Sequence, residues 1–391
     1  MLGLEDHYYI DLGGEGGSTG VASGGAAVSG TAGSVDTSGA SGASGASSAA
    51  GMAGSSEGGN AGADSAFSMP NGKLVFERYT TYDTGDSEMF LVTFPGGAIS
   101  EPLGKTYGLC ALYNGIFSPD GRHLVVGAVP NSVCPAGALD RNELEVYILD
   151  LDNPGLLGKQ RITDNNVPDE DPQYAPDGKS LLFKHGGYLA RWVAGGTPFA
   201  ETCADPTGSF CFTHSGNTFQ SKPVIDDQGY VCYESSLSQS DPNGDILCFD
   251  LAVGLAGKDI TLADNVTIAV DHDLIYDSRP VIASPWLYFT RWIGSSNRVN
   301  QIWRKPFKAA NPAESRAAFC VGQGVGYENP FGLGEGDLLL FSSNESSLGK
   351  SDLFIADFTE AMSTSLNEFA PGVNTQKDEL GASFWRAPPP P

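Results

Sequence analysis

A short pattern recurs six times along this chain, and it constrains the fold more than any other feature. Each copy begins with an apolar residue, continues with a polar turn and ends in an apolar run, as in FSPDGRHLVVGA and YAPDGKSLLFKH. The spacing of the copies alternates between 50 and 57 residues. Repetition with this period indicates six like units that stack side by side or close into a ring. The copies start at Phe67, Phe117, Tyr174, Val224, Val281 and Phe331.

Each unit carries the signals of four short antiparallel strands. The Asp-Gly and Asn-Gly pairs tolerate the positive φ of a tight hairpin, and the apolar run after them predicts a second strand. A third strand follows, as in ELEVYILDLD and SDLFIADF, and polar segments such as KQRITDN predict an outer strand. Six four-stranded sheets of about 50 residues each favour an all-β, six-bladed β-propeller. An array of β-sandwiches is the main alternative, but it requires longer strands and Greek-key connections.

The N-terminal part of the chain has a different composition. From Gly13 to about Ser65 it consists almost entirely of Gly, Ser, Ala and Thr. Such a stretch cannot bury enough apolar surface to offset the entropy lost on ordering it. We therefore expect residues 1–65 to be a disordered, low-complexity tether and residues 66–387 to form the propeller.

The chain is strongly acidic, with 47 Asp and Glu against 22 Lys and Arg and a net charge of −25. A protein with this charge repels phosphate backbones, so we expect no nucleic-acid partner. No window is long and apolar enough to predict a transmembrane segment. We expect the propeller to be a monomer.

The sequence also bears on the location of the protein. Its start, MLGLEDHYYIDLGG, lacks the basic residues and apolar run of a signal peptide. A Gly/Ser/Ala tether before a globular domain nevertheless resembles the segment that follows a secretory or lipoprotein signal in bacterial surface proteins. We therefore expect an extracellular protein or one of the cell envelope, in the periplasm or as an outer-membrane lipoprotein, with a true start upstream of Met1.

Seven cysteines are consistent with an oxidising compartment. The alternative is that all seven are buried, reduced thiols. We expect at least one of three disulfides to form, with Cys320 left over: Cys203–Cys211, Cys232–Cys248 and Cys110–Cys134.

The repeat resembles that of the TolB-like, WD-repeat-like propellers. The resemblance rests on the SPDG and APDG turns and on SSNESSLGKSDLFIADF in the last unit, and it extends over residues 67–360. The copies at Val281 and Phe331 depart from it, because they lack the Asp-Gly turn. The resemblance implies a six- or seven-bladed bacterial propeller outside the cytoplasm, with a protein-binding role or one that is not known, and it implies no catalysis.

A propeller must be locked by joining its first and last sheets. The segment GASFWRAPPPP resembles the start of a further unit. We expect residues 383–386 either to supply the inner strand of the first blade or to pack beside Phe67. A partial seventh blade is the alternative.

No catalytic signature occurs in the chain. It contains no Gly-x-Ser-x-Gly elbow, no complete phosphate-binding loop and no His-Glu-x-x-His. His272, between Asp271 and Asp273, is the only histidine in a chemically suggestive setting. We assign no catalytic residue and expect neither a metal nor a cofactor.

Two groups of residues are candidates for ligand binding. The inner segments DPQYAP, SKPVID, DSRPVI and YENPFG each offer a charged residue near a proline. We expect these residues at the mouth of the central channel, although a polar residue before this proline is also common for structural reasons: Asp171, Lys222, Arg279 and Glu328. A second candidate recognition surface, with ordinary edge packing as its alternative, consists of Tyr79, Tyr82, Arg291 and Trp292.

Together these features favour a non-catalytic propeller scaffold that binds a protein or glycan partner at the bacterial cell envelope or outside the cell. Two alternatives stay open. One is a propeller-type glycan-active enzyme, a hydrolase or lyase, with its site in the central channel. The other is a purely structural surface protein. Convergent Asp, Glu, His and Arg on the innermost strands would favour the enzyme.

Overall fold

Each copy of the sequence pattern forms one antiparallel sheet. The computed structural model describes residues 68–80, 86–134, 141–195, 211–212, 219–236, 244–251, 275–293, 299–307, 313–321, 325–334, 337–346, 348 and 350–389. All of these residues belong to one compact unit. The predictions for residues 1–65, Cys203, Tyr82 and His272 lie outside the described residues.

In every sheet the strands follow one another from the axis of the molecule outwards. Sheet 1 contains β23 (Asp378–Arg386), β1 (Gly72–Tyr79), β2 (Glu88–Phe94) and β3 (Ala98–Ile99). Sheet 2 contains β4 (Leu109–Phe117), β5 (His123–Pro130), β6 (Glu145–Asp150) and β7 (Lys159–Arg161). Sheet 3 contains β8 (Asp169–Tyr174), β9 (Ser180–His185), β10 (Tyr188–Val193) and β11 (Cys211–Phe212).

The second half of the chain continues this order. Within the described ranges, sheet 4 contains β12 (Phe219–Ile225), β13 (Tyr230–Ser236) and β14 (Asp245–Asp250). Sheet 5 contains β15 (Ile275–Ala283), β16 (Trp286–Ile293), β17 (Val299–Pro306) and β18 (Ser315–Arg316). Sheet 6 contains β19 (Tyr327–Gly332), β20 (Leu338–Ser343), β21 (Asp352–Asp357) and β22 (Thr364–Ser365). The short helical segments are α1 (Leu103–Tyr107) and the 3-10 turns Asn131–Val133, Arg141–Glu143 and Leu366–Glu368.

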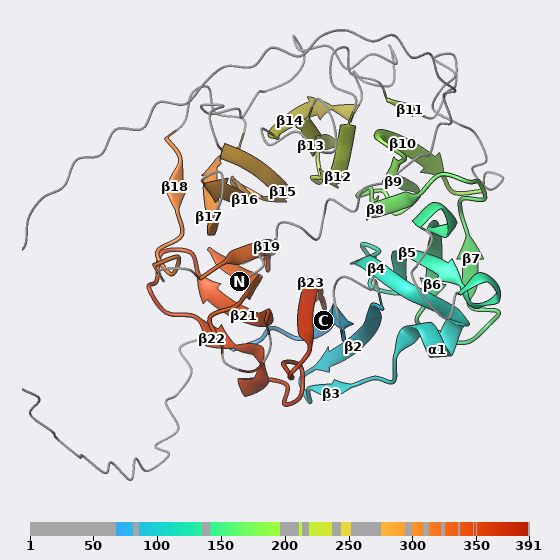
Figure 1. The fold of residues 1–391 in the computed structure, drawn as a ribbon, viewed down its shortest axis with the longest axis horizontal. Helices are drawn as coiled ribbons and strands as arrows, with labels where there is room; N and C mark the ends of the chain where they lie inside the picture. The colour runs from blue at the N-terminus through green and yellow to red at the C-terminus, as the bar shows by residue number, and fades with distance from the viewer. Residues whose placement is uncertain are drawn as a thin grey trace, which may run out of the picture. The chain divides into compact units, whose positions relative to one another are not determined.

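The six sheets are arranged around a common axis (Figure 1). Their inner strands contact one another in the order β23, β4, β8, β12, β15, β19 and back to β23. This closed order confirms the predicted six-bladed β-propeller and excludes an array of sandwiches.

Each pair of neighbouring sheets encloses its own apolar core, and six such clusters occur among the described residues. Strand β5 shows how the sequence produces them. Val125 packs in the core shared with sheet 3, whereas Val126 packs in the core shared with sheet 1. Because successive side chains of a strand point to opposite faces, a strand that is buried on both faces needs apolar residues in succession. This requirement explains the runs HLVVGA and SLLFKH.

The Asp-Gly turns join the first two strands of a sheet as predicted. Gly121 and Gly178 adopt φ values of 68° and 64°, which glycine tolerates without steric cost. In each turn the aspartate fixes the loop, because Asp120 Oδ1 accepts from the backbone N–H of Arg122 and Asp177 Oδ1 accepts from that of Lys179.

The C-terminal strand closes the ring. Strand β23 pairs with β1, so that Trp385 lies opposite Lys73. The Trp385 Nε1 donates a hydrogen bond of 3.1 Å to the carbonyl oxygen of Pro119 in sheet 2. The structure thus confirms that the segment around Trp385 supplies the inner strand of the first sheet, and this strand is longer than the predicted residues 383–386.

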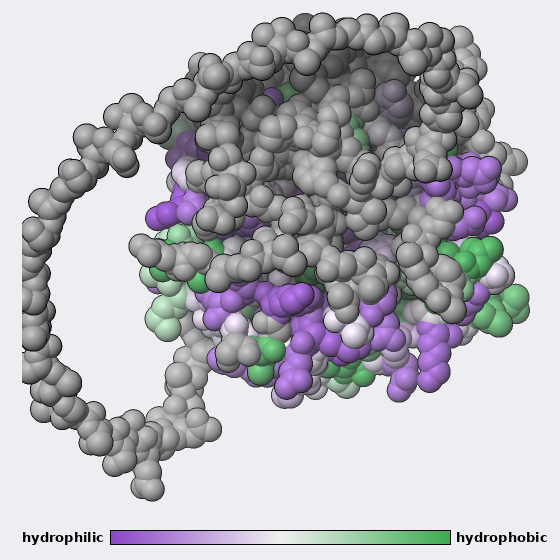
Figure 2. Space-filling view, in the orientation of Figure 1, coloured by the Kyte–Doolittle hydropathy of each residue, from purple (hydrophilic) through white to green (hydrophobic). Residues whose placement is uncertain are grey.

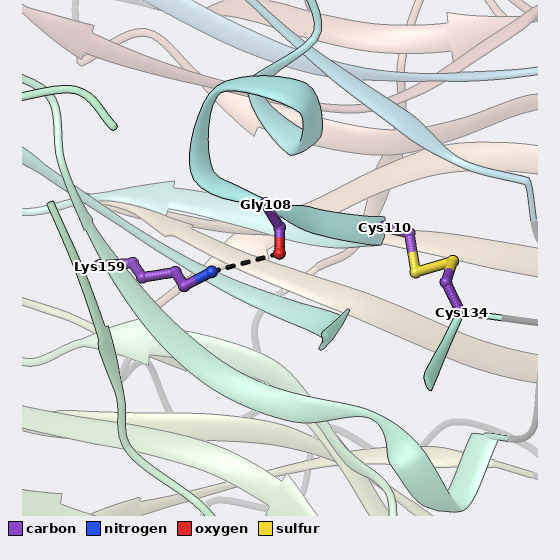
Figure 3. The surroundings of a disulfide bond; sticks show 4 residues. All are labelled: Gly108, Cys110, Cys134 and Lys159. Carbon is purple, nitrogen blue, oxygen red and sulfur yellow. Dashed lines mark hydrogen bonds between the residues drawn. A yellow bond between two sulfur atoms is a disulfide. The ribbon is translucent and has the colours of Figure 1, made fainter. Parts of the chain in front are cut away.

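Two of the three predicted disulfides form within the described residues. Cys110–Cys134 ties the start of β4 to the segment after β5, and Cys232–Cys248 joins β13 to β14. Figure 3 shows the first of these bonds together with Lys159, whose Nζ donates to the Gly108 carbonyl at 3.2 Å. Cys320 remains a free, buried thiol.

Candidate functional site

The described residues expose few large apolar side chains. In Figure 2, hydrophilic side chains gather over sheets 1 and 6, and apolar side chains occur in small separate patches. The exposed large apolar residues of the described chain are distributed over four sheets: Val133, Leu156, Leu157, Val193, Val321, Leu348 and Met362. The inner strands, by contrast, bring together many ionisable groups, so we regard them as the candidate site.

Every inner strand contains a bulge at the same place. The pairing of the strand with its neighbour shifts there, and one residue adopts a left-handed backbone with φ between 48° and 59°. A bulge leaves one extra residue unpaired. A proline follows four of the six residues, and it has no N–H that the sheet would have to satisfy. These six residues, called the bulge ring, are Asn114, Asp171, Lys222, Arg279, Asn329 and Gly381.

The bulge ring contains three of the four predicted site residues. Asp171, Lys222 and Arg279 stand at equivalent positions in sheets 3, 4 and 5. Glu328 precedes the bulge of sheet 6 by one residue, and Asn329 is the equivalent residue there. Five members of the ring are partly exposed, while Arg279 is buried. A role of the four predicted residues in ligand binding stays a prediction.

Besides Gly381, two members of the bulge ring were not predicted from the sequence, Asn329 and Asn114. Asn329 is followed by Pro330, and the same signal marked Lys222 and Arg279. Asn114 is followed by glycine instead of proline. It therefore shares no local signal with the others, and only the structure reveals its position.

Three ion pairs surround the bulge ring. Lys184 Nζ lies 2.9 Å from Glu170 Oε2, and Lys222 Nζ lies 3.7 Å from Glu234 Oε2. Arg279 Nη1 lies 2.7 Å from Glu328 Oε2, which joins sheet 5 to sheet 6. An unpaired charge in a protein interior costs several kcal/mol. The pairing therefore makes it possible for the propeller to hold three cations close to its axis.

Two further carboxyls, those of Glu77 and Asp171, are linked through Asn114. The Asn114 backbone N–H donates to Glu77 Oε1, and its side-chain Nδ2 donates to Asp171 Oδ1 at 2.7 Å. The Tyr79 hydroxyl donates to the second Glu77 oxygen, and the Lys222 backbone N–H donates to Asp171 Oδ2 at 3.2 Å. Within the described part of the chain, neither carboxyl forms a salt bridge.

Burial changes the acidity of these groups. It raises the pKa of the Glu77 carboxyl to about 7, because a poorly solvated site disfavours the charged form. The hydrogen bonds from Tyr79 and Asn114 lower that pKa, and the negative charge of Asp171 raises it. Burial likewise raises the pKa of Asp171 and of Glu234. Glu77 therefore exchanges its proton near neutral pH.

A second set of charged pairs lies two residues before the bulge, in sheets 1, 3 and 5. In each, an acid of the inner strand faces a base of the next strand directly across the ladder. This recurrence in alternate sheets indicates a structural role. The pairs are Glu379–Arg78 at 2.7 Å, Asp169–His185 at 2.6 Å and Asp277–Arg291 at 2.7 Å.

The proposed recognition surface around Arg291 was wrong. Tyr79, Arg291 and Trp292 are 4%, 4% and 6% exposed. The Tyr79 hydroxyl donates to Glu77 of the same strand. Arg291 binds Asp277 of the neighbouring strand with two guanidinium nitrogens, and Trp292 Nε1 donates to Ser278 Oγ there at 3.1 Å. These side chains belong to the interior of the sheets.

The described residues contain no group of three or more His, Cys, Asp or Glu placed to hold a metal ion. None of the helices found in those ranges has the length and apolar character needed to cross a membrane.

Known structures share this arrangement of sheets. TolB from Acinetobacter baumannii matches with a TM-score of 0.54 and 11% identity, over 80% of this chain and 66% of that protein. Hydrazine synthase from Kuenenia stuttgartiensis matches with a TM-score of 0.57 and 13% identity, over 81% of this chain and 47% of that one. The chain has the TolB-type propeller fold. It spans less than two thirds of either neighbour, no protein-family model matches it, and neither does any curated protein sequence.

Proposed function

We propose that this propeller is a non-catalytic, monomeric scaffold that binds a protein or glycan partner through the polar groups of its inner strands. The two disulfides support a location at the cell envelope or outside the cell, where such bonds persist. The TolB-type fold is consistent with a scaffold of this kind.

The backbone of the bulge ring carries the proposal. Lys222 and Arg279 hold φ values of 48° and 53°, a conformation that costs free energy for long side chains. Gly381 forms the same bulge in sheet 1, so the fold itself can use a glycine there. Strained, charged residues at equivalent positions therefore support a role in recognition.

Removing the charged groups together tests this proposal. The variant replaces the four predicted residues by alanine, and its capture of partners from an envelope extract is compared with that of the full chain. We expect partners held by the full chain to be lost. If the variant captures partners as well as the full chain does, the binding site lies elsewhere on the propeller and the proposal is wrong. The four residues are Asp171, Lys222, Arg279 and Glu328.

Two controls accompany the experiment. The exposed Arg122–Asp152 pair of sheet 2 is replaced by alanines, and capture by this variant is expected to be unchanged. A milder variant with Asp171→Asn and Lys222→Gln keeps the shape of both side chains. If the thermal midpoint of the fourfold variant is lower than that of the full chain, the capture experiment is carried out with this milder variant instead.

One observation favours the enzymatic alternative. A carboxyl with a pKa near 7, as burial produces at Glu77, suits general acid–base catalysis. A glycan-active enzyme would then use Glu77 together with Asp171. Release of reducing ends from envelope glycans by the full chain, abolished by Glu77→Gln, would support this alternative over the scaffold.

A further inference from the structure

The carboxyls of Glu77 and Asp171 differ from the other charged groups at the axis. Lys184, Lys222 and Arg279 each form an ion pair. The two carboxyls face each other across Asn114, and no cation described in the structure forms a salt bridge with either of them. An added anion would have to break one of the three ion pairs. An added cation would meet two carboxyl groups, of which Asp171 also lies within the electrostatic influence of Lys184 and Lys222.

Glycine leaves room for the Glu77 carboxyl beside the inner strand β23. A Cβ placed on Gly381 would lie 2.5 Å from Glu77 Oε1 and 2.9 Å from its Cδ. Gly381 is the only member of the bulge ring without a side chain, and the Glu77 carboxyl occupies the space that a side chain would need. Asp171 and Gly381 are both partly exposed, whereas Glu77 is 3% exposed, so a ligand at the axis approaches the carboxyl pair from the side of Asp171.

Buried hydroxyls stand beside the bulge in two other sheets. Thr290 and Ser342 occupy the positions in sheets 5 and 6 that Glu77 occupies in sheet 1, and both are 0% exposed. The register places Ser342 directly opposite Glu328, beside the bulge. The hydroxyl oxygens of Thr290 and Ser342 have no hydrogen-bond partner in the described chain. A buried polar group without a hydrogen-bond partner lowers the stability of a protein by about 1–3 kcal/mol.

The chemistry of these groups selects a class of ligand. An ionised carboxylate can only accept hydrogen bonds, whereas a hydroxyl can both accept and donate. A protonated primary amine offers three N–H donors with a positive charge and no acceptor, so the carboxylates are its natural partners. A metal ion fits less well, because the described residues hold no cluster of three ligating side chains. Hydrogen bonds between ionised partners are stronger than those between neutral groups.

We propose that Glu77 and Asp171 together bind a protonated primary amine, either the amino terminus or a lysine side chain of the partner. This inference rests on the proposed binding function and specifies what the axis recognises. Binding requires ionised Glu77, so it strengthens as the pH rises through about 7. The titratable groups that act on Glu77 are Tyr79, Asp171 and Arg279.

The probe for the test is butylammonium, with butyrate and butanol as its anionic and neutral counterparts. Ligand-observed NMR on the full chain measures their binding near neutral pH. We expect millimolar binding of butylammonium and none of the other two. Glu77→Gln and Asp171→Asn should each weaken butylammonium binding at least about tenfold, which corresponds to the loss of one charge-assisted hydrogen bond. Glu77→Gln should also remove the increase in binding as the pH rises through about 7.

Glu145→Gln is the matched control. The Glu145 carboxyl is also buried, and burial raises its pKa to about 7 as well. It belongs to β6 in sheet 2 and pairs with Arg161 instead of contributing to the axis. This variant should bind butylammonium as the full chain does. A thermal midpoint for each variant shows that it is folded.

Peptides distinguish the two sources of the amine. An alanine tripeptide with a free amino terminus represents the first, and an acetylated peptide with one lysine represents the second. Absence of butylammonium binding, or equal binding to the Glu77→Gln and Asp171→Asn variants, would overturn the proposal. If partner capture still depended on the four predicted residues in that case, the scaffold would stand and only the ligand class would be wrong.

Discussion

The buried carboxyl of Glu77 should destabilise the propeller at neutral and alkaline pH. Its pKa rises from 4.5 to about 7 on folding, so the folded state binds the proton more tightly than the unfolded state does. Stability from such a group is present at low pH and is lost as the pH rises from the unfolded pKa to the folded one. At about 1.4 kcal/mol for each tenfold change in proton affinity, the penalty above the folded pKa is about 3 kcal/mol.

Glu77→Gln removes this penalty, because glutamine has the shape of the protonated acid and stays neutral. Its Oε1 can still accept from the Asn114 backbone N–H. We expect the free energy of unfolding of the variant to exceed that of the full chain by about 1 kcal/mol at about pH 5 and by about 3 kcal/mol at about pH 8. The difference between the two proteins isolates Glu77 from other titrating groups.

Urea unfolding followed by circular dichroism at several pH values measures this difference. Glu145→Gln is less suited to the purpose, since its salt bridge with Arg161 is lost at the same time. A difference between Glu77→Gln and the full chain that does not change with pH, or a variant that is less stable at about pH 8, would refute the reasoning about burial.

Three further predictions concern the ring and its bonds. Deleting residues from Gly381 onward should lower the thermal midpoint strongly, because it removes most of β23 and the buried Phe384, whereas deleting residues 388–391 should not. Gly381→Ala should lower the free energy of unfolding, measured with urea, by at least about 1 kcal/mol more than Gly229→Ala does. Both glycines have positive φ, but of the two only Gly381 has another group within 4 Å of the added Cβ. Replacing Cys232 and Cys248 by serine removes a disulfide between residues 16 positions apart. The free energy of unfolding, measured with urea, should fall by about 3 kcal/mol, and a variant as stable as the oxidised full chain would contradict this.

Local signals explain why the number of sheets could be predicted from the sequence. The turn at Gly121 and the double-faced burial of Val125 and Val126 depend on residues close together in the chain. Closure by the segment around Trp385 was also predictable, because that segment repeats the start of a unit. These features need only the preferences of hairpins and apolar strands.

The bulge ring and the carboxyl pair could not be predicted in full, because they depend on contacts between distant residues. Lys222 and Arg279 have side chains that disfavour a left-handed backbone, so no local preference indicates their conformation. From the sequence, Glu77 is an ordinary polar residue of a strand, and only the structure shows that its carboxyl packs against the inner strand at Gly381. The Arg78–Glu379 pair joins residues 301 positions apart.

The recognition surface proposed around Trp292 failed for a related reason. Its position near the end of a strand suggested exposure, but both faces of that strand are covered by neighbouring sheets. Aromatic residues at the ends of strands are therefore weak indicators of a binding surface in a propeller.

A crystal structure of the full chain with butylammonium would show directly whether Glu77 and Asp171 bind the amine. We expect the ammonium nitrogen to lie within hydrogen-bond distance of the carboxyl oxygens of both Glu77 and Asp171, at the axis of the six inner strands. An amine bound elsewhere on the propeller, with Glu77 and Asp171 contacting only Asn114 and their other present partners, would contradict it.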